Sequence, residues 1–120
     1  MNTGLAAVTF SGSLSPQHDT AGNILSNIRI IGIDPAGVFR GHSTAGILIN
    51  HPPSMPGKPR NNRVEATIID LGPNGQYGWL DTSTGSGNVG LDLTILGGAH
   101  EVKPVWIAHA GGKVTLSTHN

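Results

Sequence analysis

The sequence predicts an all-β protein, an antiparallel β-sandwich or jelly-roll-like fold with a small barrel as the alternative. Aliphatic residues alternate with small or polar residues in several stretches, which is the period of a strand with one buried face. The 18 glycines and 8 prolines divide these stretches at short intervals. Evidence for helices is thin. Many short strands separated by turn residues are typical of antiparallel sandwiches and barrels.

The clearest strand candidate runs from Asn88 to Leu96. Val89, Leu91, Leu93 and Ile95 alternate there with Gly90, Asp92 and Thr94. This alternation predicts four aliphatic side chains on one face of the strand. Burying each of them is worth roughly 1.5–3 kcal/mol. We therefore expect this stretch to form part of the hydrophobic core.

The same reasoning gives further strand candidates along the chain. They are Leu5–Leu14, Ile28–Ile33, Gly37–Gly41, Gly46–Asn50, Arg63–Leu71, Gln76–Asp81, Glu101–His109 and Lys113–Thr118. Turn residues separate them at positions 34–37, 72–75, 97–98 and 111–112. Asn74-Gly75 is the strongest hairpin signal and Gly111-Gly112 the second. Asn23–Asn27 could instead form a single helical turn.

The chain is predicted to be a single β domain over residues 1–120. It shows no internal repeat and no linker that would divide it. One long proline-rich segment, His51–Asn62, contains four prolines and is expected to be an extended loop or arm.

Composition limits the possible function. Seven basic and seven acidic residues cancel, so no electrostatic attraction to nucleic acid or to an anionic membrane is expected. Only 12% of residues are charged, against about 25% in an average soluble domain. This favours a subunit whose surface is partly covered by neighbours. The absence of cysteine excludes disulfides and thiolate metal sites. Because no signal peptide or membrane span is legible, synthesis in the cytoplasm without export is expected.

The proline-rich segment is the first candidate site. A dozen residues without secondary structure inside a compact domain usually indicate disorder or a function. Met55 is its only sizeable apolar anchor, so a bound partner is a natural source of stabilisation. The alternative is an arm that lies over its own sheet. The residues expected to contact a partner are Pro52, Pro53, Met55, Pro56, Lys58, Pro59, Arg60 and Arg63.

The second candidate is the predicted hairpin at Asn74-Gly75. A two-residue turn there would place Asp70 opposite Trp79 and Ile68 opposite Asp81. Asp70 and Asp81 would then be diagonal neighbours about 7–8 Å apart. A face made of Asp70, Tyr77, Trp79 and Asp81 is similar in kind to a sugar-binding platform. Catalysis there would also need a pocket that raises the pKa of one carboxyl group, and the sequence predicts no such pocket.

No catalytic or metal-binding motif is present, so the chain is expected not to be an enzyme and to need no metal or cofactor. The six histidines, His18, His42, His51, His100, His109 and His119, are scattered without ligand spacing. There is no Gly-x-Ser-x-Gly elbow, and Gly85-Ser86-Gly87 is not followed by a phosphate-binding lysine.

These features predict a non-catalytic structural protein that forms a dimer or trimer and docks on a larger protein assembly. In general character the chain resembles the head decoration (cement) proteins of tailed phages. That resemblance implies a virion location and a role in stabilising the capsid shell. The alternative function is a carbohydrate-binding β-sandwich that uses the aromatic and acidic hairpin face.

Overall fold

The computed structural model describes residues 3–14, 19–39, 43–83, 87–98, 105–107 and 113–119. These residues form short strands and no helix. The first strands in the chain are β1 (Thr3–Phe10), β2 (Thr20–Ala21), β3 (Ile24–Ser26) and β4 (Arg29–Ile31). The next are β5 (Ser43–Ile49), β6 (Pro59–Arg60), β7 (Arg63–Glu65) and β8 (Ile68–Asp70). The last are β9 (Tyr77–Asp81), β10 (Val89–Leu96), β11 (Val105–Ile107) and β12 (Lys113–His119).

All paired strands run parallel, so the predicted antiparallel sandwich, jelly roll or barrel is wrong. One sheet has the order β1-β5-β9-β11. A second has the order β3-β7-β10-β8-β4, with β12 also paired to β10. A third, small sheet contains β2 and β6. The single antiparallel contact among the described residues is an isolated bridge between Ser13 and Gly57.

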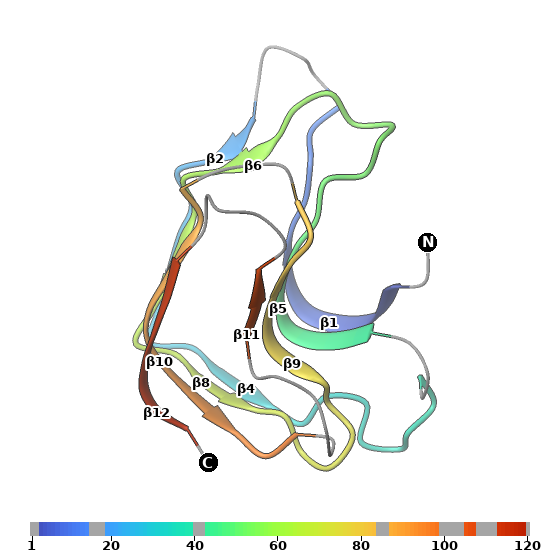
Figure 1. Ribbon diagram of the computed structural model, residues 1–120, viewed down its shortest axis with the longest axis vertical. Helices are drawn as coiled ribbons and strands as arrows, with labels where there is room; N and C mark the ends of the chain where they lie inside the picture. Colours follow the sequence, from blue (N-terminus) through green and yellow to red (C-terminus); the bar gives the residue numbers. More distant parts are fainter. Residues whose placement is uncertain are drawn as a thin grey trace.

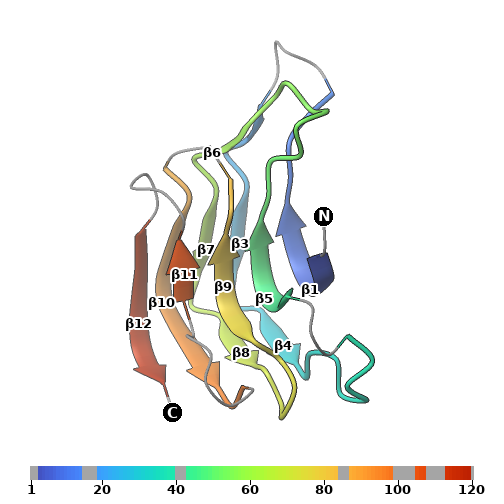
Figure 2. The same cartoon turned by 45° about the vertical axis from the view of Figure 1, so that its right-hand side comes forward.

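The chain winds through these sheets in successive circuits and forms a short parallel β-helix (Figures 1 and 2). We call each circuit a rung. The first rung contains β1 to β4, the second β5 to β8, and the third β9 and β10. Strands β11 and β12 belong to a fourth rung. Each strand therefore pairs with the strand one circuit later and not with its neighbour in sequence.

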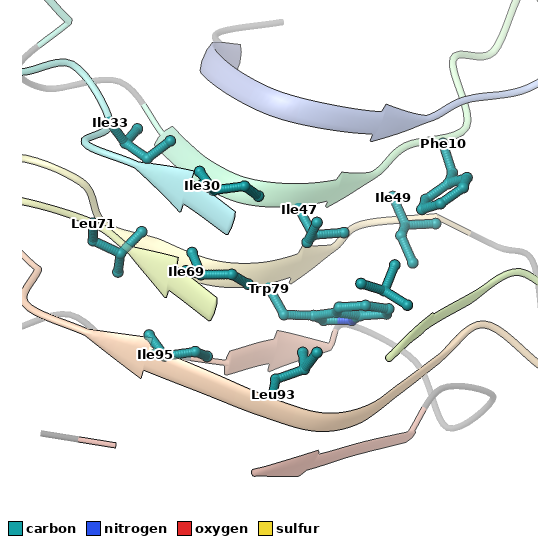
Figure 3. Packing of buried hydrophobic residues seen from close by; sticks show 11 residues of the cluster. Phe10, Ile30, Ile33, Ile47, Ile49, Ile69, Leu71, Trp79, Leu93 and Ile95 are labelled. Atoms are coloured by element: carbon teal, nitrogen blue, oxygen red, sulfur yellow. The ribbon is translucent and has the colours of Figure 1, made fainter. Parts of the chain in front are cut away.

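The hydrophobic core lies between the two larger sheets, as Figure 3 shows. Ile47 and Trp79 come from one sheet, and Ile69, Leu93 and Ile95 come from the other. Trp79 and Leu93 are fully buried. Equivalent positions of successive rungs stack: Ile30 pairs with Ile69, and Ile69 pairs with Ile95. Aliphatic residues from several of the predicted strands therefore form a core, although in a different topology.

Residues in the left-handed region of backbone conformation form corners that repeat from rung to rung. Gly22, Asn61 and Gly87 occupy one corner, with φ of 74°, 54° and 74°. Asn27, Ala66 and Asp92 occupy the next, with φ of 56°, 48° and 57°. Glycine and asparagine tolerate this conformation, whereas alanine is strained in it. The corners explain why the strand predicted over Arg63–Leu71 is divided into β7 and β8.

The corner at Asp92 also corrects the predicted face of Asn88–Leu96. A Cβ placed on Gly90 would lie 3.1 Å from Cζ3 of Trp79, so position 90 faces the core. Leu93 and Ile95 are buried, whereas Val89 and Leu91 are only half-buried. The left-handed residue between the two halves reverses the alternation. The predicted single row of four aliphatic residues is therefore divided between two faces.

Candidate functional site

Among the described residues, the first rung lies at one end of the stack, and its strands are paired on one side only, as are β11 and β12 of the fourth rung at the other end. Strand β1 pairs with β5, β2 with β6, β3 with β7 and β4 with β8. Their other edges carry backbone N–H and C=O groups without a neighbouring strand in the described part of the chain. Such edges are ready to pair with a further strand.

Exposed apolar side chains gather on the same rung. Among the residues whose side-chain exposure the structure describes, the exposed large hydrophobic ones all belong to this rung or to the loop that follows it: Leu14, Ile24, Ile31, Val38 and Phe39. Leu14, Val38 and Ile31 keep 77%, 74% and 73% of their surface accessible. Because these side chains all lie toward one end of the stack, we take this end as a candidate interaction surface.

The loop after β4 carries two of these residues, and hydrogen bonds fix its backbone. Asp34 is buried, and its carboxylate accepts hydrogen bonds from the backbone N–H of Val38 at 2.8 Å and of Phe39 at 2.9 Å. The Asn74 side chain reaches this loop from the second rung and donates to the carbonyl oxygens of Asp34 and Pro35, both at 3.1 Å. Val38 and Phe39 therefore lie on a loop whose backbone is fixed by hydrogen bonds with the side chains of Asp34 and Asn74.

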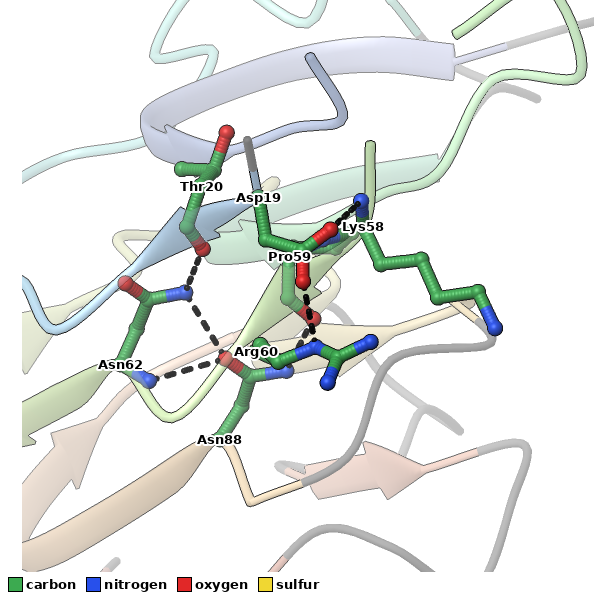
Figure 4. A network of polar contacts seen from close by, with 7 residues as sticks. All are labelled: Asp19, Thr20, Lys58, Pro59, Arg60, Asn62 and Asn88. Carbon is green, nitrogen blue, oxygen red and sulfur yellow. Dashed lines mark hydrogen bonds and ion pairs between the residues drawn. The ribbon is translucent and has the colours of Figure 1, made fainter. Parts of the chain in front are cut away.

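Asparagines of successive rungs stack at one corner, and Figure 4 shows two of them, Asn62 and Asn88. We call Asn23, Asn62 and Asn88 the asparagine ladder. Oδ1 of Asn62 accepts from the backbone N–H and from Nδ2 of Asn23, at 3.2 and 2.9 Å. Oδ1 of Asn88 accepts from the same two groups of Asn62, at 3.1 and 2.9 Å. The two steps are identical in kind although the residues are 39 and 26 positions apart.

Asn62 and Asn88 also donate a hydrogen bond to a backbone carbonyl of the preceding rung. Nδ2 of Asn62 donates to the carbonyl oxygen of Thr20 at 2.8 Å, and Nδ2 of Asn88 donates to that of Pro59 at 2.9 Å. Asn62 and Asn88 are buried, so these bonds satisfy amides that would otherwise be costly to bury. The ladder therefore fixes the stacking register of the rungs.

Asn23 ends the ladder on the first rung and leaves half of its amide open. It is exposed, and it gives its N–H and one Nδ2 contact to Asn62. No described residue donates to its Oδ1, the position at which Asn62 and Asn88 each accept two hydrogen bonds. A second Nδ2 hydrogen is also available, because the terminal amide carries two. The open edge thus presents one acceptor and one donor at a defined point.

The structure places the predicted proline-rich arm against its own first rung. Gly57 forms the bridge with Ser13, and Pro59 and Arg60 form β6 beside β2. Asp19 accepts from the backbone N–H of Lys58 at 2.7 Å and forms an ion pair with Arg60 at 2.7 Å (Figure 4). Met55 is half-buried, and its sulfur accepts from Ser11 at 3.9 Å. The chain itself therefore supplies much of the stabilisation expected from a partner.

The remaining arm residues are divided between exposed and covered positions. Pro53, Pro56, Lys58 and Arg63 are exposed, and Pro52 is half-buried. Arg63 lies 4.0 Å from Glu65, both partly accessible to solvent. Contact between this segment and a partner stays a prediction.

The predicted hairpin at Asn74-Gly75 is wrong, because the strands on its two sides belong to different sheets. Asp70 in β8 pairs with Ile31 and Leu96, and Trp79 in β9 pairs with Ile47 and Val105. The fully buried side chains of Trp79 and Asp81 cannot offer a surface to a ligand, while Asp70 and Tyr77 are half-buried elsewhere. Gly111-Gly112 lies outside the described residues, but β11 and β12 on its two sides also belong to different sheets.

The histidines give no metal site in the described part of the chain, where no group of three or more histidine and carboxylate residues could hold an ion. His51 contacts the carbonyl oxygen of Met55 through Nε2 at 2.7 Å. His18, His42, His100 and His109 lie outside the described residues. The described residues contain no helix that could cross a membrane.

Sequence reasoning missed the ladder, although a signal for it exists. The pairs Gly22-Asn23, Asn61-Asn62 and Gly87-Asn88 each combine a residue that tolerates the left-handed corner with the stacked asparagine. The intervals of 39 and 26 residues differ, so a search for a fixed period does not find them.

Comparison with known proteins does not assign the chain to a family: no protein-family model, no curated protein and no solved structure matches it.

Proposed function

We propose that this chain is a non-catalytic structural protein that self-associates and takes its place in a larger protein assembly. The observation that carries the proposal is the first rung, which combines unpaired strand edges with the exposed large hydrophobic side chains found among the residues whose exposure is described. Strand edges supply main-chain hydrogen bonds to a protein partner, and apolar side chains supply affinity. Location in a virion, as a capsid decoration protein, is the narrower form of this proposal.

Light scattering after size-exclusion chromatography tests self-association. We expect a dimer or trimer that dissociates on dilution. The double substitution Val38→Ser with Phe39→Ser should weaken association, because it removes two exposed apolar side chains from the first rung. Leu91→Ser is the matched control, since Leu91 is half-buried on the outer face of the third rung. A wild-type chain that stays monomeric at high concentration would contradict the proposal.

The carbohydrate-binding alternative has no support in the geometry. Its four residues lie in two different sheets, and two of them are buried in the protein.

A further inference from the structure

We infer that the partner on the first rung is a second copy of this chain, bound head to head through a two-fold axis close to Asn23. This inference rests on the proposed self-association and adds to it the surface, the orientation and the residue at the axis. Three observations support it. The side-chain amide of Asn23 has unused hydrogen-bonding groups, the fourth rung has no asparagine at the ladder position in the sequence, and the end of the stack has the dimensions of a dimer interface.

The open groups of Asn23 are self-complementary. One unused acceptor, Oδ1, and one unused hydrogen on Nδ2 remain after its bonds to Asn62. Two asparagines facing each other across a two-fold axis can therefore exchange two N–H···O bonds. A two-fold interface brings the same patch of both subunits together, as this pairing requires.

In a head-to-tail arrangement, the first rung of one copy would contact the fourth rung of the next, and Asn23 would not face a second Asn23. The register pairs Arg63 with Ile24, Val89 with Arg63, and Lys113 with Val89. In the sequence, the residue before Lys113 is Gly112, where the earlier rungs have Asn23, Asn62 and Asn88. Glycine has no side-chain amide, so the sequence of the fourth rung offers no asparagine there with which a second copy could continue the ladder. The head-to-head arrangement also closes after two copies, whereas head-to-tail stacking would produce open filaments.

The outer dimensions of the end of the stack are compatible with a dimer interface. Strands of one sheet lie close behind one another in Figure 1 and are spread apart in Figure 2, so the shortest axis runs near the stacking direction. The other two extents of the molecule are 40 and 29 Å. They bound the end of the stack at roughly 1,000 Å², and each partner of a stable dimer buries about 800 Å². Strands brought together by this axis run antiparallel, a pairing that mixed sheets commonly contain.

The absence of cysteine allows a direct test. Ile24 is exposed next to Asn23, and Thr115 is exposed on β12 of the fourth rung. We expect the single variant Ile24→Cys to give a covalent dimer with a short bis-maleimide cross-linker, and Thr115→Cys alone to give none. Head-to-tail stacking would instead cross-link only an equimolar mixture of the two variants.

The outcomes separate this inference from the proposed function. An oligomer that cross-links only as the mixture, or in no combination, overturns the head-to-head interface and leaves self-association standing. A wild-type monomer in light scattering overturns both.

A charge substitution tests the residue at the axis. Asn23→Asp places two carboxylates opposite each other, so we expect the dimer dissociation constant to rise about tenfold or more. Asn27→Asp is the matched control, because it makes the same charge change on the same rung at the corner where the third rung has Asp92. Circular dichroism verifies folding, and the cross-linking result stands by itself if Asn23→Asp does not fold. Equal effects of the two substitutions would contradict a specific role for Asn23.

Discussion

Nδ2 of Asn62 lies 2.9 Å from Oδ1 of Asn88, which is 26 positions further along the chain. This amide contact joins the second and third rungs, and the same contact between Asn23 and Asn62 joins the first and second. Stacked amides of this kind are known to stabilise in-register parallel strands. The ladder therefore adds a continuous row of side-chain hydrogen bonds beside the hydrophobic core of the β-helix.

Removing the middle amide should be the most damaging ladder substitution. Asn62→Ala deprives Thr20, Asn23 and Asn88 of partners at a buried site. We expect a loss of about 2–4 kcal/mol in the free energy of unfolding, because buried groups left unpaired cost about 1–3 kcal/mol each. Urea denaturation measures it. Asn23→Ala, at the exposed end, is the control and should cost about 1 kcal/mol or less. Equal losses in the two variants would show that the stabilisation from a ladder asparagine does not depend on its burial.

The strained corner at Ala66 offers a stabilising substitution. Ala66 is exposed at φ 48°, and the equivalent positions in the neighbouring rungs are Asn27 and Asp92. Ala66→Asn should raise the free energy of unfolding by about 0.5–1 kcal/mol, because asparagine tolerates the left-handed conformation better than alanine. The melting temperature should rise accordingly. Ala21→Asn, at an exposed strand position without a positive φ, should bring no such gain.

The close approach of the two large sheets depends on glycine at position 78. A Cβ there would lie 2.4 Å from Cδ1 of Ile95. Gly78→Ala should therefore destabilise the protein by about 1–3 kcal/mol through overpacking. Ile95→Ala should also destabilise it, through a cavity. In the double variant the new methyl group occupies space that Ile95 vacates, so the combined loss should be smaller than the sum. Strict additivity in urea denaturation would contradict this packing.

Trp79 is buried with an indole N–H that has no hydrogen-bond partner in the described part of the protein. Trp79→Phe removes that N–H and keeps an aromatic ring in the core. We expect it to cost about 1 kcal/mol, whereas Trp79→Ala should cost about 3–5 kcal/mol. Guanidinium denaturation followed by circular dichroism compares the two. A loss as large for phenylalanine as for alanine would indicate that the N–H is bonded after all.

The sequence identified much of the core but not the topology. Leu93, Ile95 and Trp79 lie within predicted strands and are buried. The alternation of buried and exposed side chains is the same in parallel and antiparallel sheets. It therefore could not reveal that each strand pairs with a strand one circuit further along the chain. One available signal was overlooked: residues 44–49 are all buried and include the apolar run from Ala45 to Ile49. Near-continuous apolar strands are typical of parallel sheets, which are covered on both faces.

The candidate site was harder to predict, because it depends on which edges remain open. Exposure of Ile24 and Ile31 follows from their place on the first rung and not from their residue type. The arm was expected to need a partner because its contacts with Ser13 and Asp19 join residues far apart in the chain. Such contacts have no local sequence signature.

The unequal spacing of the ladder has a practical consequence for protein engineering. The segment between β5 and β6 extends from Asn50 to Lys58, and the one between β9 and β10 from Thr82 to Asn88, yet Asn62 and Asn88 still stack. The strands that follow a side loop thus keep their stacking register whatever the length of that loop. Pro53 and Ser54, exposed at a turn, mark a position where a foreign epitope could be grafted while the scaffold keeps its register.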